Sequence, residues 1–311
     1  MASSAMSWGE PSLETAISTV HQGRLIYRGS DATLLARSAT WEDAAESLWQ
    51  AGRMVSLTFS PDGANEQPFA ALAALIQESY PGLGRSPGRL FADGEAAISR
   101  LAEAFGAAPI EGALDRRLAR GWSLDGDFAE ALRCALVLLA DHELNASTFS
   151  VRVAASTGAP VAACLLAGLS ALTGPRHGGA GAAALALLDE AQRRGPCIAV
   201  RQTLAAQRHL PGFGHPLYPM GDPRAAALFE ILPKFGLADD LRAEVEEVSG
   251  LRPNIDFALA VLTRLGHLPD DASFRLFALG RSIGWVAHAI EQFGQDKLIR
   301  PRAQYTGNLP D

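Results

Sequence analysis

Two histidines lie in glycine-rich turns, in the stretches Gly174-Pro-Arg-His-Gly-Gly-Ala180 and Gly212-Phe-Gly-His-Pro-Leu-Tyr-Pro219. Glycine lets the backbone approach a ligand closely and adopt a positive φ, so a histidine between glycines can sit at a tight turn with its ring directed into a cleft. His177 and His215 both fit this description. These two turns, and the helices expected around them, are therefore the first candidates for the chemistry of the chain.

Length and composition describe an ordinary globular protein with an acidic surface. The 311 residues permit one large or two modest domains, and 48% of them are hydrophobic. The formal net charge of −7 disfavours general nucleic-acid binding, which needs a basic surface. Three cysteines without a C-x-x-C spacing predict neither a disulfide framework nor a zinc site, and a reducing cytoplasm is the expected compartment.

Neither a signal peptide nor a membrane segment is predicted. Residues 1–9 lack a charged segment followed by an apolar one. The longest apolar run, residues 135–140, is far shorter than the roughly 20 residues that a spanning helix requires.

The hydrophobic pattern predicts a mostly α-helical chain after a short strand or hairpin at residues 17–29. Thr40 is expected to cap the first long helix, with Glu42 and Asp43 in its first turn. The helices are expected at residues 41–49, 67–80, 95–105, 128–141, 160–172, 178–194, 201–209, 223–235, 238–248, 254–265 and 272–293.

Several familiar catalytic patterns do not occur. The glycine turn at residues 212–217 lacks the last glycine of G-x-G-x-x-G, and neither a P-loop nor a G-x-S-x-G turn is present. The histidines form no short-range metal pair such as H-E-x-x-H, so no metal site is predicted.

Each candidate residue also has a structural interpretation when taken alone. His142 can act as a cation at the end of its helix, and Asp256, in the stretch Pro253-Asn-Ile-Asp-Phe257, can simply cap the next one. Its place in a first helical turn also predicts that the helix dipole favours its charged form. Arginine is by default a surface cation, and this applies to Arg224, Arg281 and Arg302. The joint occurrence of two histidines, a carboxylate and arginines favours acid/base chemistry on an anion.

The segments together closely resemble the citrate synthase family in its short bacterial form. Six motifs in the family's order carry the resemblance, which covers roughly residues 20–307: His142-Glu-Leu-Asn-Ala-Ser-Thr-Phe149, Gly174–Ala180, Gly212–His215 with Asp222-Pro-Arg224, Pro253–Phe257, Phe277-Ala-Leu-Gly-Arg281 and Arg300-Pro-Arg-Ala-Gln-Tyr-Thr-Gly307. Family membership implies an all-α, two-domain subunit that works as a homodimer, with substrates bound in the cleft between the domains. The corresponding division is a large domain of residues 1–177 and 268–311 and a small domain of residues 178–267.

The resemblance implies an acyltransferase that condenses acetyl-CoA with oxaloacetate to give citrate and CoA, without a cofactor. Asp256 would remove a proton from the acetyl methyl group, His177 would hydrogen-bond the thioester oxygen, and His215 would polarise the keto group and protonate the new alkoxide. The oxaloacetate carboxylates would be held by His142, Arg224 and Arg281, and Arg300 would complete the site of the partner subunit. Phe277 would shape the pocket.

Some positions depart from the family's pattern. Pro216 and Pro219 stand where many members carry basic residues that help to bind the CoA phosphates, and Gly181, Ala258 and Leu259 replace polar residues. Two alternatives therefore stay open beside the acetyl-CoA reaction. One is a 2-methylcitrate synthase that uses propionyl-CoA, and the other is a non-catalytic protein that binds the dicarboxylate and regulates another process.

Overall fold

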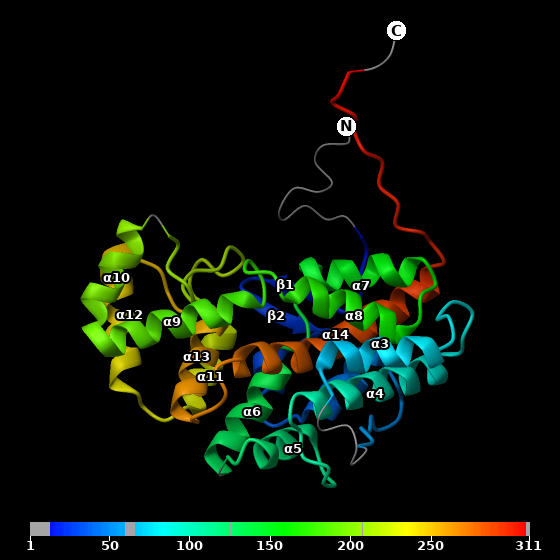
Figure 1. Ribbon diagram of the computed structural model, residues 1–311, viewed down its shortest axis with the longest axis horizontal. Coiled ribbons are helices and arrows are strands. Elements are labelled where there is room, and N and C mark those ends of the chain that lie inside the picture. The colour runs from blue at the N-terminus through cyan, green and yellow to red at the C-terminus, as the bar shows by residue number, and fades with distance from the viewer. Residues whose placement is uncertain (1–12, 60–65, 125, 207, 309–311) are drawn as a thin grey trace.

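The computed structural model describes residues 13–59, 66–124, 126–206 and 208–308, and within these ranges the chain is helical apart from one small sheet (Figure 1). The all-α prediction is confirmed. The expectation for residues 1–9 lies outside the described residues. The helices are α1 Ala32–Leu35, α2 Trp41–Trp49, α3 Pro68–Glu78, α4 Pro87–Ala104, α5 Leu114–Gly121, α6 Gly126–Leu138, α7 Ala146–Ser156, α8 Val161–Leu172, α9 Gly179–Arg194, α10 Pro196–Ala205, α11 Pro223–Ile231, α12 Gly236–Ser249, α13 Ile255–Leu265 and α14 Ala272–Gln295.

The sheet is the hairpin expected near the start of the chain. Strands β1 (Ser18–His21) and β2 (Arg24–Tyr27) pair antiparallel, with Ser18 opposite Tyr27, and the two-residue β3 (Ser30–Asp31) extends them. Its apolar side is buried through Ile17, Leu25 and Tyr27. The hairpin therefore belongs to the core of the helical body.

The start of α2 was predicted from its cap at Thr40. Thr40 accepts a hydrogen bond from the backbone N–H of Asp43 at 3.1 Å, and the Asp43 carboxylate accepts one from the N–H of Thr40 at 2.8 Å. This reciprocal capping box satisfies two of the orphan donors at a helix start. The predicted helix at 41–49 is confirmed to the residue.

Two predicted helix starts are wrong by more than two residues, and three helices were not predicted. The helix expected at 201–209 is α10, which begins at Pro196 directly after Gly195, because this glycine turns at a φ of 89° and proline is tolerated in a first helical turn. Helix α4 begins at Pro87 rather than near residue 95. Helices α1, α5 and α7 had no prediction, and α7 begins inside the polar stretch 142–149.

The helices form two groups joined by α14 (Figure 1). Helices α9 to α13 gather at one end of the molecule, where α9 packs against α13 and α10 against α12. The other group contains α2 to α8 and the hairpin, and α14 packs against α2, α4, α6, α7 and α8 within it. Helix α14 also contacts α9 and α13, so it reaches both groups.

Helix α14 approaches the end of α6 unusually closely. A Cβ atom on Gly280 would lie 2.6 Å from the Cβ of Leu139, and one on Gly284 would lie 2.2 Å from a carboxylate oxygen of Asp141. The backbone N–H of Gly284 donates to the carbonyl of Ala140 at 2.9 Å. Only glycine permits this approach, and it brings α14 against the turn that carries His142.

Candidate active site

His142 and two rings from the second glycine turn form one aromatic cluster. His142 follows the end of α6 and is buried, and its Nε2 lies 2.9 Å from the hydroxyl of Tyr218. The rings of His142 and His215 meet edge to face with centroids 5.2 Å apart, and the Tyr218 ring lies 4.9 Å from that of His215. Burial, followed by the charges of Arg224 and Arg281, holds the pKa of His142 well below its ordinary value. His142 is therefore neutral at pH 7 and able to act as a hydrogen-bond donor.

Arg281 is a buried cation, and some of its hydrogen-bond donors have no acceptor among the described residues. Its Nε donates to the carbonyl of Leu139 at 2.9 Å, whereas its two terminal nitrogens have no hydrogen-bond partner among the described residues. The guanidinium lies over the ring of Phe277, 4.7 Å from its centroid. Burial lowers its pKa to about 10, which leaves it charged at neutral pH. Because an unpaired buried guanidinium is costly, this side chain is suited to bind a carboxylate.

Arg224 is held by an acid two residues before it. Asp222 accepts hydrogen bonds from Nε and Nη2 of Arg224 at 3.0 and 2.8 Å, and both side chains are buried. Burial opposes the charge on Arg224, but Asp222 outweighs it and raises the pKa of the guanidinium. Asp222 also caps α11 by accepting from the N–H of Arg224 at 3.0 Å. Arg224 is thus fixed in orientation.

The turn that carries His215 is attached to the start of α13. The backbone of Gly214 donates to Arg252 at 2.8 Å, and that of Asn254 donates to Gly212 at 2.9 Å. Gly212 and Gly214 both have a positive φ, at 81° and 75°. The predicted need for glycine at these two positions is confirmed.

His215 presents a defined tautomer. Its Nδ1 accepts a hydrogen bond from the N–H of Leu217 at 3.2 Å, so the neutral ring carries its proton on Nε2. Burial, followed by the charge of Arg224, lowers the pKa of His215 to about 4. His215 is therefore neutral at pH 7, with Nε2 available as a donor.

His177 contacts a serine that the sequence did not single out. Its Nε2 lies 2.8 Å from Oγ of Ser147. This hydroxyl accepts from the indole of Trp285 at 3.2 Å and donates to Oδ1 of Asn145 at 2.7 Å. The one hydrogen of the hydroxyl has a second possible acceptor in Nε2 of His177. When it is directed at His177 instead, the neutral ring keeps its proton on Nδ1 and can donate it to a ligand. Burial, followed by the charge of Arg281, lowers the pKa of His177 to about 4.

Asp256 occupies the first turn of α13 without capping it. Asn254 is the cap, since its side-chain oxygen accepts from the N–H of Asp256 at 3.0 Å. The cap interpretation of Asp256 is therefore wrong. Desolvation by the surrounding protein raises the pKa of Asp256 to about 6, although Arg224 lies close enough to oppose this rise. The position of Asp256 in the first turn is confirmed, but burial and not the helix dipole decides the direction of its pKa shift.

The structure places most of the predicted site residues around one region. The rings of His177 and Phe277 meet edge to face, with centroids 5.5 Å apart, and this pair connects the first glycine turn to Arg281. Arg300 is the exception. It is exposed in the extended segment after α14, which leads away from the helical body (Figure 1).

Three residues that complete the site were missing from the prediction: Ser147, Tyr218 and the acid Asp222 in its role toward Arg224. Ser147 and Tyr218 lie within stretches that had been singled out, so the stretches were informative even though the partners could not be assigned. Within the described residues, no group of three or more His, Cys, Asp or Glu side chains is arranged to hold a metal ion. No helix in that part of the chain is long and apolar enough to cross a membrane.

Comparison with known proteins agrees with this fold. The family model for the C-terminal domain of citrate synthase matches residues 111–302. Citrate synthase 2 of Bacillus subtilis is 35% identical over 232 residues, which are 68% of this chain and 61% of that protein. The chain therefore belongs to the citrate synthase family, although this match spans only about three fifths of the bacterial relative.

Solved structures match over nearly the whole chain. The crystal structure of citrate synthase from Thermotoga maritima has a TM-score of 0.78 and 26% identity, and the match covers 97% of this chain and 95% of that one. Citrate synthase from Thermoplasma acidophilum, solved as a ternary complex with carboxymethyl coenzyme A and oxaloacetate, has a TM-score of 0.75 at 23% identity, with 96% and 94% covered. The two-domain helical fold of this family is thereby shown for the chain.

Proposed function

We propose that the protein condenses acetyl-CoA with oxaloacetate to give citrate and CoA. The observation that carries the proposal is the pair of buried arginines beside neutral histidines, in which Arg281 has two terminal nitrogens without a partner among the described residues. A dicarboxylate with a keto group fits these donors. The two guanidiniums bind carboxylates, and a neutral histidine donates to the keto oxygen.

The proposed reaction begins at the acetyl methyl group. Asp256 takes a methyl proton, and His177 donates a hydrogen bond to the thioester oxygen as the enol forms. A carboxylate with a pKa of about 6 is mostly ionised at pH 7 and is a stronger base than an ordinary aspartate. The methyl carbon then attacks the keto carbon of oxaloacetate, and the proton on Nε2 of His215 passes to the new alkoxide. The proton that Asp256 took from the methyl group is released to solvent and His215 takes one up in return, so both residues regain their starting forms. Water finally cleaves the thioester of citryl-CoA and releases citrate and CoA.

Domain closure is part of the proposal. Residues 178–267 form the proposed small domain, which carries His215, Arg224 and Asp256, and the remaining residues form the large domain with His142 and Arg281. Closure would bring Asp256 toward His177 and exclude water during enol formation. Structures with and without oxaloacetate that show no relative movement of these units would contradict closure.

A homodimer is the proposed active unit, because Arg300 lies away from the site of its own chain. In the dimer, Arg300 would reach the dicarboxylate of the partner subunit, across an interface that includes the helices between residues 128 and 172. A catalytically active monomer in analytical ultracentrifugation would contradict this assignment.

The decisive assay follows the release of the CoA thiol from acetyl-CoA and, in a parallel reaction, from propionyl-CoA. We expect release that depends on oxaloacetate, with citrate identified by mass spectrometry. Faster release from propionyl-CoA would instead identify a 2-methylcitrate synthase. Calorimetric titrations with oxaloacetate and with CoA, run separately, test the third interpretation, a non-catalytic protein that binds the dicarboxylate. The exposed Pro216 and Pro219 favour this interpretation. A regulatory protein would bind oxaloacetate, ignore CoA and release no thiol.

A further inference from the structure

The hairpin near the start of the chain is fastened to the residues on both sides of His142. The hydroxyl of Ser18 donates to the Asp141 carboxylate at 2.5 Å and accepts from the backbone N–H of Glu143 at 2.9 Å. The Glu143 carboxylate in turn accepts from Oγ1 of Thr19 at 3.0 Å and from the N–H of Val20 at 2.8 Å. Strand β1 therefore forms hydrogen bonds with the residue before His142 and with the residue after it.

A second contact comes from the other strand of the hairpin. The hydroxyl of Tyr27 is fully buried and lies 3.0 Å from the carbonyl of Leu138 and 3.1 Å from that of Asp141, and the N–H of Asp141 lies 3.2 Å from the same oxygen. These groups are the last carbonyls of α6 and the backbone that follows it. The hairpin therefore closes the end of α6 and directs the chain into the His142 turn.

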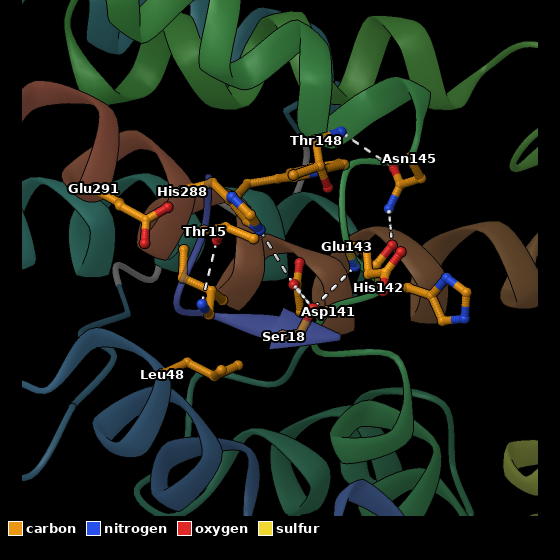
Figure 2. A network of polar contacts seen from close by, with 12 residues as sticks. Thr15, Ser18, Leu48, Asp141, His142, Glu143, Asn145, Thr148, His288 and Glu291 are labelled. Atoms are coloured by element: carbon orange, nitrogen blue, oxygen red, sulfur yellow. Dashed lines mark hydrogen bonds and ion pairs between the residues drawn. The ribbon is translucent and has the colours of Figure 1, made fainter. Parts of the chain in front are cut away.

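Helix α14 completes the arrangement from the opposite side. His288 is fully buried, and its Nε2 lies 3.2 Å from the same Asp141 oxygen that Ser18 contacts. Figure 2 shows Asp141 between Ser18 and His288, with the His142 ring pointing away from all three. Arg281 lies two helical turns before His288 on α14. The network therefore connects the strand, the His142 turn and the helix that carries Arg281.

The His142 turn requires such support because its backbone is strained. Glu143 has a φ of 51°, in the left-handed region that is unfavourable for residues other than glycine. Strained backbone persists where surrounding contacts enforce it, and the contacts here come from Ser18 and Thr19. Residues 18–20 do not belong to the proposed catalytic set.

We propose that Ser18 is a positioning residue for substrate binding, which holds the His142 turn in the conformation that receives the dicarboxylate. The inference rests on the proposed function for the identity of the ligand. Without the hydroxyl, the turn has lost its bridge between Asp141 and Glu143 and spends less time in the competent conformation. The apparent Kd rises in inverse proportion to the competent fraction.

The test compares Ser18→Ala with a matched buried serine elsewhere. Ser99 on α4 is buried, accepts from the N–H of Thr58 at 3.1 Å and donates to the carbonyl of Glu95 at 2.7 Å, so Ser99→Ala also removes one donated and one accepted hydrogen bond. We expect Ser18→Ala to raise the Kd for oxaloacetate about tenfold in calorimetry and to leave the KM for acetyl-CoA unchanged. Ser99→Ala should leave both unchanged, even if its melting temperature falls.

A ligand-free measurement separates this proposal from the proposed function. In hydrogen exchange with mass spectrometry, Ser18→Ala should speed exchange in the peptide of residues 138–145, and Ser99→Ala should not. The exposed Thr19→Val, which removes only the contact of Thr19 with Glu143, should produce the same change to a smaller degree. If Ser18→Ala fails to fold, this milder variant provides the same comparison.

The outcomes are distinct. Unchanged exchange and unchanged Kd in the hairpin variants overturn the positioning role of Ser18. An equal rise of Kd in Ser99→Ala also overturns it, since general destabilisation then explains the effect. If the wild type does not bind oxaloacetate, the proposed function fails, and the exchange comparison still decides whether Ser18 holds the turn.

Discussion

The two halves of the candidate site differ in how completely the protein encloses them. The dicarboxylate half is made of His142, Arg224 and Arg281, all buried and each with at least one hydrogen bond to the protein. The thioester half contains His177 and Asp256, which keep partial exposure. Pro216 and Pro219, which stand where many family members carry basic residues that help to bind CoA, are exposed and define the proposed outer edge of this half. Contacts within the protein thus order the first half, and we propose that the ligand and domain closure complete the second.

This difference indicates how the chemistry is divided. Enclosed cations with fixed orientation bind a small anion well, because the protein has already met the cost of ordering them. A base must instead exchange protons, and the partial enclosure of Asp256 raises its pKa to about 6 without isolating it. Changes in the thioester half should therefore alter turnover while binding of the dicarboxylate persists.

The largest expected effect is a loss of turnover when Asp256, in the thioester half, is replaced by asparagine. Asparagine has nearly the same shape but cannot accept the methyl proton, so Asp256→Asn should lower turnover by at least ~10²-fold, within the 10²–10⁴-fold that general-base catalysis typically contributes. Deuterium exchange of the acetyl-CoA methyl group in the presence of oxaloacetate measures the proton transfer directly.

Oxaloacetate binding to the same variant is the control. The Kd should stay within about twofold of the wild type, because Arg224 and Arg281 are untouched and Asn254 still caps the helix. Methyl exchange at the wild-type rate in Asp256→Asn would exclude this residue as the base. A large loss of oxaloacetate affinity would show that the two halves are not separable.

We expect the loss of kcat/KM at low pH to result from protonation of Asp256 alone. The base must be unprotonated, so kcat/KM should fall about tenfold per pH unit below the pKa of about 6, and level off above it. His177 and His215, with pKa values of about 4, stay neutral across this range and should add no limb near 6.5. Steady-state rates between pH 5 and 8 provide the profile.

The pH dependence of oxaloacetate affinity tests whether the dicarboxylate half titrates independently of the thioester half. The affinity should change little between pH 6 and 8, since the arginines remain charged and the pKa of His142 lies well below its ordinary value. An acid limb centred near 6.5, together with a parallel change in Kd, would instead assign the titration to a histidine of the dicarboxylate half.

Local signals in the sequence predicted the elements and the candidate residues, and tertiary contacts decided the rest. The helix cap at Thr40 and the glycine turn of His215 are local, and both were predicted. The contact of Ser18 with Asp141 joins residues 123 positions apart, so no local pattern could reveal it. The raised pKa of Asp256 was missed for a related reason, because it arises from the enclosure of the carboxylate and not from its place in the helix.

The smallest expected effect concerns the exposed edge of the thioester half. Pro219 stands where many family members carry a basic residue, and its exposed position can accept a long side chain. An exposed ion pair typically contributes 0.2–1 kcal/mol, so Pro219→Arg should lower the KM for acetyl-CoA by about 1.4-fold to fivefold at low salt. The gain should vanish near 0.5 M salt because screening removes it.

The neutral Pro219→Gln controls for the loss of the proline ring and should leave KM unchanged. An equal fall in both variants would assign the effect to the backbone rather than to charge. A change in oxaloacetate affinity in Pro219→Arg would show that the edge and the enclosed half are coupled, contrary to the division that burial suggests.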